Sequence, residues 1–149
     1  MDARVAPISV LIADDQPILR DALVDFINLF DDLRVLAAVA SGAEAIEMVR
    51  AEAPDVALVD IRMPGGGPDL VRAIHQAAPS TRVLVVSASG GQQIVMEMLL
   101  AGADGYLVKG EMPIKVVEGI QAVAAGGRPV SPELLDDEVR ALLARPRES

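Results

Sequence analysis

Acidic side chains follow two aliphatic runs of the sequence. Asp14 and Asp15 come directly after ISVLIA (8–13), and Asp60 ends VALVD (56–60). Ligands of open parallel sheets collect beyond the carboxyl ends of the strands, so we expect these three carboxylates to converge there. Neighbouring carboxylates raise the cost of ionising one another unless a cation lies between them. The pattern therefore predicts a divalent cation site. Mg²⁺ fits best because it takes one or two carboxylates, keeps several waters and accepts phosphate oxygens.

Three further polar residues lie at the end of, or within, two other aliphatic runs. Ser87 ends the run RVLVVS (82–87), Lys109 ends GYLVK (105–109), and Tyr106 lies within the latter run. Taken singly, each has an ordinary structural role: a strand-end hydroxyl, a solvated charge and a packed ring. Beside the acidic cluster, however, the lysine supplies a second cation and the serine a hydroxyl donor. Such an assembly can hold three phosphoryl oxygens.

A carboxylate inside this assembly can act as a nucleophile, because carboxylates form acyl phosphates. Asp60 is the best placed of the three, since it ends the predicted central strand. Asp14 and Asp15 would then hold the metal. The ordinary alternative for each aspartate alone is a turn or helix cap, in which Asp is common.

The elements that must position these groups alternate regularly along the chain. Aliphatic runs predict strands at 8–13, 34–40, 56–60, 82–87 and 105–109. Apolar residues at helical spacing predict helices from Pro17, from Ser41 with Glu44 as a capping box, from about Asp69, from about Gln92 and from Pro113. This alternation indicates parallel βαβ units with right-handed crossovers.

Composition limits the possible functions. The 149 residues are 52% hydrophobic and only 2% aromatic, with a formal net charge of −9 and no cysteine. The core must therefore be aliphatic, disulfides and thiol chemistry are excluded, and an acidic chain is a poor partner for DNA phosphates. No apolar run approaches the roughly 18 residues of a membrane span, so we expect a cytoplasmic protein without a membrane partner.

The tail differs from the rest of the chain. Ser131-Pro132-Glu133 resembles a helix start, Leu135, Val139 and Leu142 lie near one helical face, and Pro146 ends the segment. We interpret 1–127 as one domain and 128–149 as a linker with one C-terminal helix. The apolar side of that helix is expected to pack on the domain or to form a dimer.

Four motifs, LIADDQP, VALVDIRMPG, VLVVSAS and AGADGYLVKG, occur in this order and resemble the receiver domain of two-component response regulators. The similarity spans roughly 8–127. The stretch PIKVVEGIQAVAAGGRPVSPEL further resembles the subfamily with a helix-turn-helix DNA-binding output domain, for which this chain has no room. The resemblance implies a flavodoxin-like α/β three-layer sandwich, with a five-stranded parallel sheet of order 2-1-3-4-5 and five flanking helices.

The resemblance also implies a role for each site residue. Asp60 would accept a phosphoryl group from a sensor histidine kinase, and Asp15, Asp60 and the backbone carbonyl of Arg62 would ligate Mg²⁺, with Asp14 acting through bound water. Lys109 would pair with the phosphoryl group, Ser87 would swing toward it, and Tyr106 would turn inward. No enzyme activity beyond self-phosphorylation and dephosphorylation is implied. The readout would be a homodimer, through the first and fifth helices or the fourth, or contact with a transcriptional output element.

One departure from relatives concerns the loop after Met63-Pro64. It reads Gly65-Gly66-Gly67-Pro68, and this glycine content predicts a loose backbone next to the site.

Two alternatives remain, an enzyme and a degenerate receiver. An enzyme of the Rossmann-like, nucleotide-binding kind would need a glycine-rich phosphate loop after the first strand, and an aspartate-nucleophile phosphatase would need an acid where Arg62 stands. A degenerate receiver would have the fold but would never be phosphorylated. A titration with Mg²⁺ and a phosphate mimic separates these possibilities.

Overall fold

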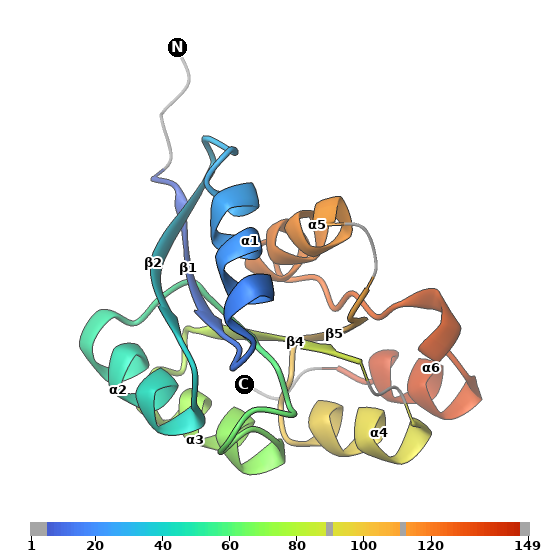
Figure 1. Cartoon of the computed structure of the whole chain (residues 1–149). Coiled ribbons are helices and arrows are strands. Elements are labelled where there is room, and N and C mark those ends of the chain that lie inside the picture. The colour runs from blue at the N-terminus through green and yellow to red at the C-terminus, as the bar shows by residue number, and fades with distance from the viewer. Residues whose placement is uncertain (1–5, 89–90, 111–112, 147–149) are drawn as a thin grey trace.

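A five-stranded parallel sheet with strand order β2-β1-β3-β4-β5 forms the centre of the protein (Figure 1). The computed structural model describes residues 6–88, 91–110 and 113–146. The strands are β1 (Ile8–Ala13), β2 (Leu33–Val39), β3 (Val56–Val59), β4 (Arg82–Ser87) and β5 (Gly105–Val108). The predicted strand order is confirmed, and each predicted strand lies within one residue of the observed one.

Helices cover both faces of the sheet. They are α1 (Pro17–Ile27), α2 (Gly42–Glu52), α3 (Pro68–Ala77), α4 (Gln92–Leu100), α5 (Pro113–Ala124) and α6 (Asp137–Leu143), with a short 3-10 helix, η1 (Pro132–Leu134). Figure 1 shows α1 and α5 on one face and α2, α3 and α4 on the other. The three layers agree with the predicted fold class.

Alternation along the buried strands divides the core in two. In β1, Val10 and Ile12 join the cluster beneath α1 and α5, whereas Leu11 and Ala13 join the cluster beneath α2, α3 and α4. This division follows from the two-residue period of a strand, which sends successive side chains to opposite faces. Because both faces are covered, the central strand β3 is apolar and buried throughout, as VALV.

Helix α2 begins as its sequence predicts. The Oγ of Ser41 accepts a hydrogen bond from the backbone N–H of Glu44 at 3.2 Å, and Glu44 Oε1 accepts one from the N–H of Ala40 at 3.1 Å. The first bond satisfies a donor that the helix start leaves unpaired, so the cap at Ser41 is confirmed, while the Glu44 carboxylate bonds to the residue before the cap.

The predicted start of the tail helix at Ser131 was wrong. The segment forms η1 and then α6, because the carboxylate of Asp136 accepts a hydrogen bond from the N–H of Val139 at 2.8 Å and starts a new helix there. Such capping competes with continuation of the preceding helix. Val139 and Leu142 of α6 are buried in the core cluster that also contains α4, so the expected packing of this helix on the domain is confirmed.

The chain before η1 runs along the edge of β5. Tyr106 N–H donates to the carbonyl of Pro129 at 2.9 Å, and Ser131 N–H donates to the carbonyl of Tyr106 at 3.0 Å. The Oγ of Ser131 accepts a further bond from the N–H of Val108 at 2.9 Å. Residues 129–131 therefore cover the backbone of this edge strand.

Among the described residues, no helix is both long and apolar enough to cross a bilayer.

Candidate functional site

Main-chain hydrogen bonds bring the ends of the strands to one edge of the sheet. The N–H of Asp60 donates to the carbonyl of Ala13 at 3.0 Å, and the N–H of Lys109 donates to the carbonyl of Ser87 at 2.7 Å. The N–H of Asp14 donates in the same way to a backbone carbonyl at the end of β2. The sheet ladder thus continues one residue past each strand, and it fixes the backbone positions from which the site residues project.

Three carboxylates meet at this edge, as predicted. Asp14, Asp15 and Asp60 each offer one oxygen, and these oxygens all lie within 4.8 Å of one another. Asp14 and Asp60 are each only 4% exposed, whereas Asp15 is exposed. An all-oxygen donor set that faces solvent on one side fits a hard divalent cation that keeps part of its water shell. We refer to these three residues as the acidic cluster.

The ammonium group of Lys109 lies against the acidic cluster. Its Nζ is 2.8 Å from Asp60 Oδ2 and 3.1 Å from Asp14 Oδ2. Burial alone would lower the pKa of Lys109, but the hydrogen bonds and charges of Asp60 and Asp14 outweigh burial and raise this pKa. Lys109 is therefore a cation at neutral pH. Three carboxylates against one ammonium leave a surplus of two negative charges, which a divalent cation would neutralise.

Backbone donors orient the two buried carboxylates. Asp60 Oδ1 accepts from the N–H of Arg62 at 3.0 Å, and Asp14 Oδ1 accepts from the N–H of Gln16 at 2.8 Å. The guanidinium of Arg20 donates to the carbonyl of Asp14 at 2.8 Å. Sequence reasoning missed Arg20 and Gln16, because neither belongs to an acidic or strand-end pattern.

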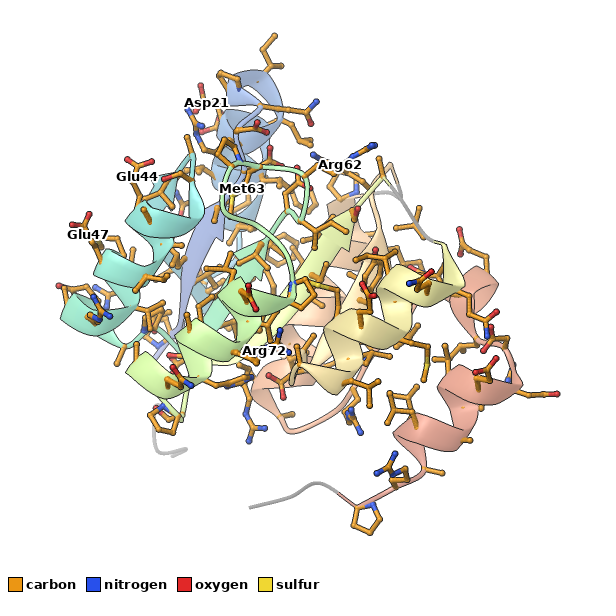
Figure 2. The ribbon with its side chains drawn as sticks, turned by 90° about the horizontal axis from the view of Figure 1, so that it is seen from below. Asp21, Glu44, Glu47, Arg62, Met63 and Arg72 are labelled. Atoms are coloured by element: carbon orange, nitrogen blue, oxygen red, sulfur yellow. The ribbon has the colours of Figure 1, made fainter. Side chains whose placement is uncertain are left out.

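Arg62 and Met63 lie on the loop between β3 and α3, at the same end of the sheet (Figure 2). The side chain of Met63 is buried, whereas Arg62 is exposed. An open cleft of about 770 Å³ passes over the site, and its lining includes Asp15, Gln16, Asp60, Arg62 and Lys109. The buried Asp60 can therefore be reached from solvent.

Ser87 and Tyr106 lie beneath the site, and both are fully buried. Their side chains are hydrogen-bonded to each other. Burial raises the pKa of the Tyr106 phenol, the bond to Ser87 opposes this effect, and the charge of Asp60 adds to it. The ring of Tyr106 already lies inside the protein in this structure, where it packs in the cluster that contains α4 and α6. The expected turn of Tyr106 on phosphorylation stays a prediction.

The prediction of a loose glycine loop was wrong. A Cβ on Gly66 would lie 2.7 Å from the carbonyl oxygen of Ile61 and 2.8 Å from that of Asp60. A Cβ on Gly42 would collide with the carbonyl of Gly65. Gly42 and Gly66 are needed for close backbone contact, and the contact of Gly42 with Gly65 packs the loop against the start of α2.

Gly66→Ala is expected to lower the free energy of unfolding by about 1–3 kcal/mol, because the new methyl group must displace the backbone of Asp60 or Ile61. Urea denaturation followed by circular dichroism measures this loss. Gly91→Ala is the matched control, since a Cβ at Gly91 meets nothing within 4 Å and its φ is −62°. Equal stability of the Gly66 variant and the wild type would contradict the close packing.

Comparison with known proteins agrees with this geometry. A family model described as the response regulator receiver domain matches residues 10–121. The chain belongs to this family.

Several relatives of the chain are named as regulators of transcription. The chain is 35% identical over 128 residues to "Transcriptional regulatory protein LnrK" of Bacillus subtilis, covering 85% of this chain and 58% of that protein. It is 35% identical over 129 residues to "Probable transcriptional regulatory protein NarL" of Mycobacterium tuberculosis, covering 86% and 60%. This chain therefore spans about three fifths of the length of these curated relatives.

Solved structures show the same fold. A LuxR-family two-component response regulator from Aurantimonas has a TM-score of 0.83 at 29% identity, with 91% of this chain and 97% of that chain covered. The signal receiver domain of the putative response regulator NarL from Mycobacterium tuberculosis has a TM-score of 0.78 at 34% identity, with 82% and 99% covered. The receiver fold inferred from the motifs is confirmed.

Proposed function

We propose that this chain is a phosphorylatable receiver whose phosphoacceptor is Asp60, with a sensor histidine kinase as donor. The observation that carries the proposal is the position of the Asp60 carboxylate. It is almost fully buried, it lies 2.8 Å from a lysine ammonium and within the acidic cluster, and it borders an open cleft.

The acidic cluster would hold Mg²⁺ through Asp15 and Asp60, with the backbone carbonyl of Arg62, while Asp14 would act through water. When bound, the metal supplies positive charge that offsets the charge of the transferring phosphoryl group. A carboxylate oxygen of Asp60 forms the new bond to phosphorus as the bond from phosphorus to the donor nitrogen breaks. The electron pair of that bond leaves with the donor. The product is an acyl phosphate on Asp60.

Lys109 and Ser87 are the residues that would respond to the new group. A phosphoryl group adds about −1.5 to −2 charge and three acceptor oxygens. Both side chains would contact the phosphoryl group only in the phosphorylated state, and this difference in contacts is what a shift between two conformations requires. Ser87 must first release its bond to Tyr106, so we propose that the Ser87–Tyr106 pair is the switch.

The chain would act as a signalling module and not as an enzyme on other substrates. We propose that 1–127 is the receiver unit, that 128–149 forms a linker with one helix, and that any contact with DNA is made by a separate output domain. A homodimer through α1 and α5 is favoured over one through α4. Helix α6 lies beside α4, where Gln92 Nε2 donates to Glu138 Oε1 at 2.6 Å, and it therefore covers part of that helix (Figure 1).

The proposal is tested by titrating the protein with beryllofluoride, a phosphoryl mimic, in the presence and absence of Mg²⁺. We expect saturable binding only with Mg²⁺, with shifts in the amide signals of Ser87 and Lys109. A degenerate receiver would show no binding of the mimic under either condition, and that result would reject the proposal.

A further inference from the structure

Gln16 stands at the N-cap position of α1, but its side chain makes no capping hydrogen bond. Its Oε1 instead accepts a hydrogen bond from Lys109 Nζ at 2.6 Å, although the two residues are 93 positions apart in the sequence. Gln16 also lines the cleft above Asp60. The side chain of Gln16 therefore leaves the helix end uncapped and bonds instead to a residue of the phosphoacceptor site, which indicates a role in that site.

The ammonium of Lys109 has three hydrogens and can donate three bonds. Its three acceptors are Gln16 at 2.6 Å, Asp60 at 2.8 Å and Asp14 at 3.1 Å. Gln16 is the nearest of them and the only neutral one. It therefore fixes the ammonium group without cancelling the positive charge that faces the acidic cluster.

The two charged acceptors are also the residues that would change partners during phosphorylation. When Asp60 becomes an acyl phosphate, its carboxylate charge is replaced by the charge of the phosphoryl group, and metal-bound water would compete with Lys109 for Asp14. The bond from Lys109 to Gln16 involves neither event. Of the three contacts of the ammonium group, it is the one whose acceptor takes part in neither event.

We propose that Gln16 is a positioning residue that holds Lys109 over the phosphoacceptor before and after phosphoryl transfer. This inference rests on the proposed function of Asp60. A neutral amide suits the role, because a carboxylate at this position would keep the bond to Lys109 but would repel the incoming phosphoryl group.

The first test compares Gln16→Leu with wild type in binding of beryllofluoride at saturating Mg²⁺. We expect binding to weaken about tenfold, as for loss of one hydrogen bond to a charged group, while Mg²⁺ affinity changes less than about twofold. Gln16→Glu should also bind the mimic more weakly than wild type, owing to charge repulsion. The matched control is Gln76→Leu, since Gln76 is exposed on α3 and lies outside the site. Unchanged affinity of the Gln16→Leu variant would overturn the proposal.

The second test reports on the Lys109 ammonium group directly and needs no phosphoryl mimic. The sequence contains only two lysines, Lys109 and Lys115, so the side-chain ¹⁵N spectrum of the full chain holds two ammonium signals. At fixed pH, the Lys109 hydrogens should exchange with water several-fold faster in Gln16→Leu than in wild type. In Gln16→Glu they should remain protected, which is a rescue that loss of local structure would not produce.

The exposed Lys115 provides the internal reference for exchange. Equal Lys109 exchange in wild type and Gln16→Leu, or a wild-type Lys109 signal as unprotected as that of Lys115, would overturn the role of Gln16. If instead the wild type failed to bind the mimic while Lys109 remained protected by Gln16, the proposed function would fail and the contact itself would stand.

Discussion

Asp60→Asn is expected to reduce labelling by acetyl phosphate by roughly three orders of magnitude, as is usual when a nucleophile is removed. Asparagine has nearly the same shape, and its side-chain oxygen can still accept the hydrogen bond from the N–H of Arg62. It has no carboxylate charge, and its amide does not form an acyl phosphate. The loss would therefore reflect the missing nucleophile and not a collapsed site. Intact-protein mass spectrometry after incubation with acetyl phosphate and Mg²⁺ measures the labelled fraction.

The matched control for this experiment is Asp69→Asn. The side chain of Asp69 is 99% exposed on α3, and its ion pair with Arg72 is a surface contact. Labelling of the control should equal that of wild type. Persistent labelling of the Asp60 variant would move the nucleophile to another residue, with Asp14 and Asp15 as the first candidates.

Asp15→Ala is expected to weaken Mg²⁺ binding by roughly 100-fold or more, since loss even of a group that only supports a metal ligand costs 10–100-fold. The carboxylate is exposed, and in the metal-free protein it adds a like charge to the acidic cluster. The variant should therefore be at least as stable as wild type without metal, yet it should lose the rise in melting temperature that Mg²⁺ produces in wild type. Isothermal titration calorimetry and thermal melts measure the two effects.

Asp21→Ala is the control, because Asp21 is also exposed, on α1 (Figure 2), but does not belong to the acidic cluster. Its Mg²⁺ affinity should match that of wild type. If the Asp15 variant bound Mg²⁺ as tightly as the control, direct ligation by Asp15 would be excluded.

The sheet and the acidic cluster were predictable because each depends on short, local patterns. An unbroken aliphatic run specifies a strand buried on both faces, and the parallel order of such strands brings their carboxyl ends together. Asp14, Asp15, Asp60 and Lys109 could therefore be placed from the sequence, since each stands at the end of a run.

The contacts that sequence reasoning missed depend on distant residues. Nothing local to Gln16 indicates that its amide reaches Lys109, because the 93 intervening residues decide where that lysine lies. The glycine loop was misjudged for the same reason. Glycine content predicts freedom of the backbone, but the close approach of Gly42 and of the carbonyls before Gly66 uses the missing Cβ atoms for packing. The break in the tail helix depended on whether Asp136 would cap or continue a helix, and its sequence allows both.

The pairing of residues 129–131 with β5 has a consequence for the border of the sheet. An unpaired strand at the border of a sheet offers its backbone donors and acceptors to any other extended chain, and this is a common route to aggregation. Here the linker fills that position on one side of the sheet, and the apolar residues of α6 shield the neighbouring helix. A shortened version ending at Gly127 would leave both surfaces bare, and we expect it to self-associate more readily than the full chain.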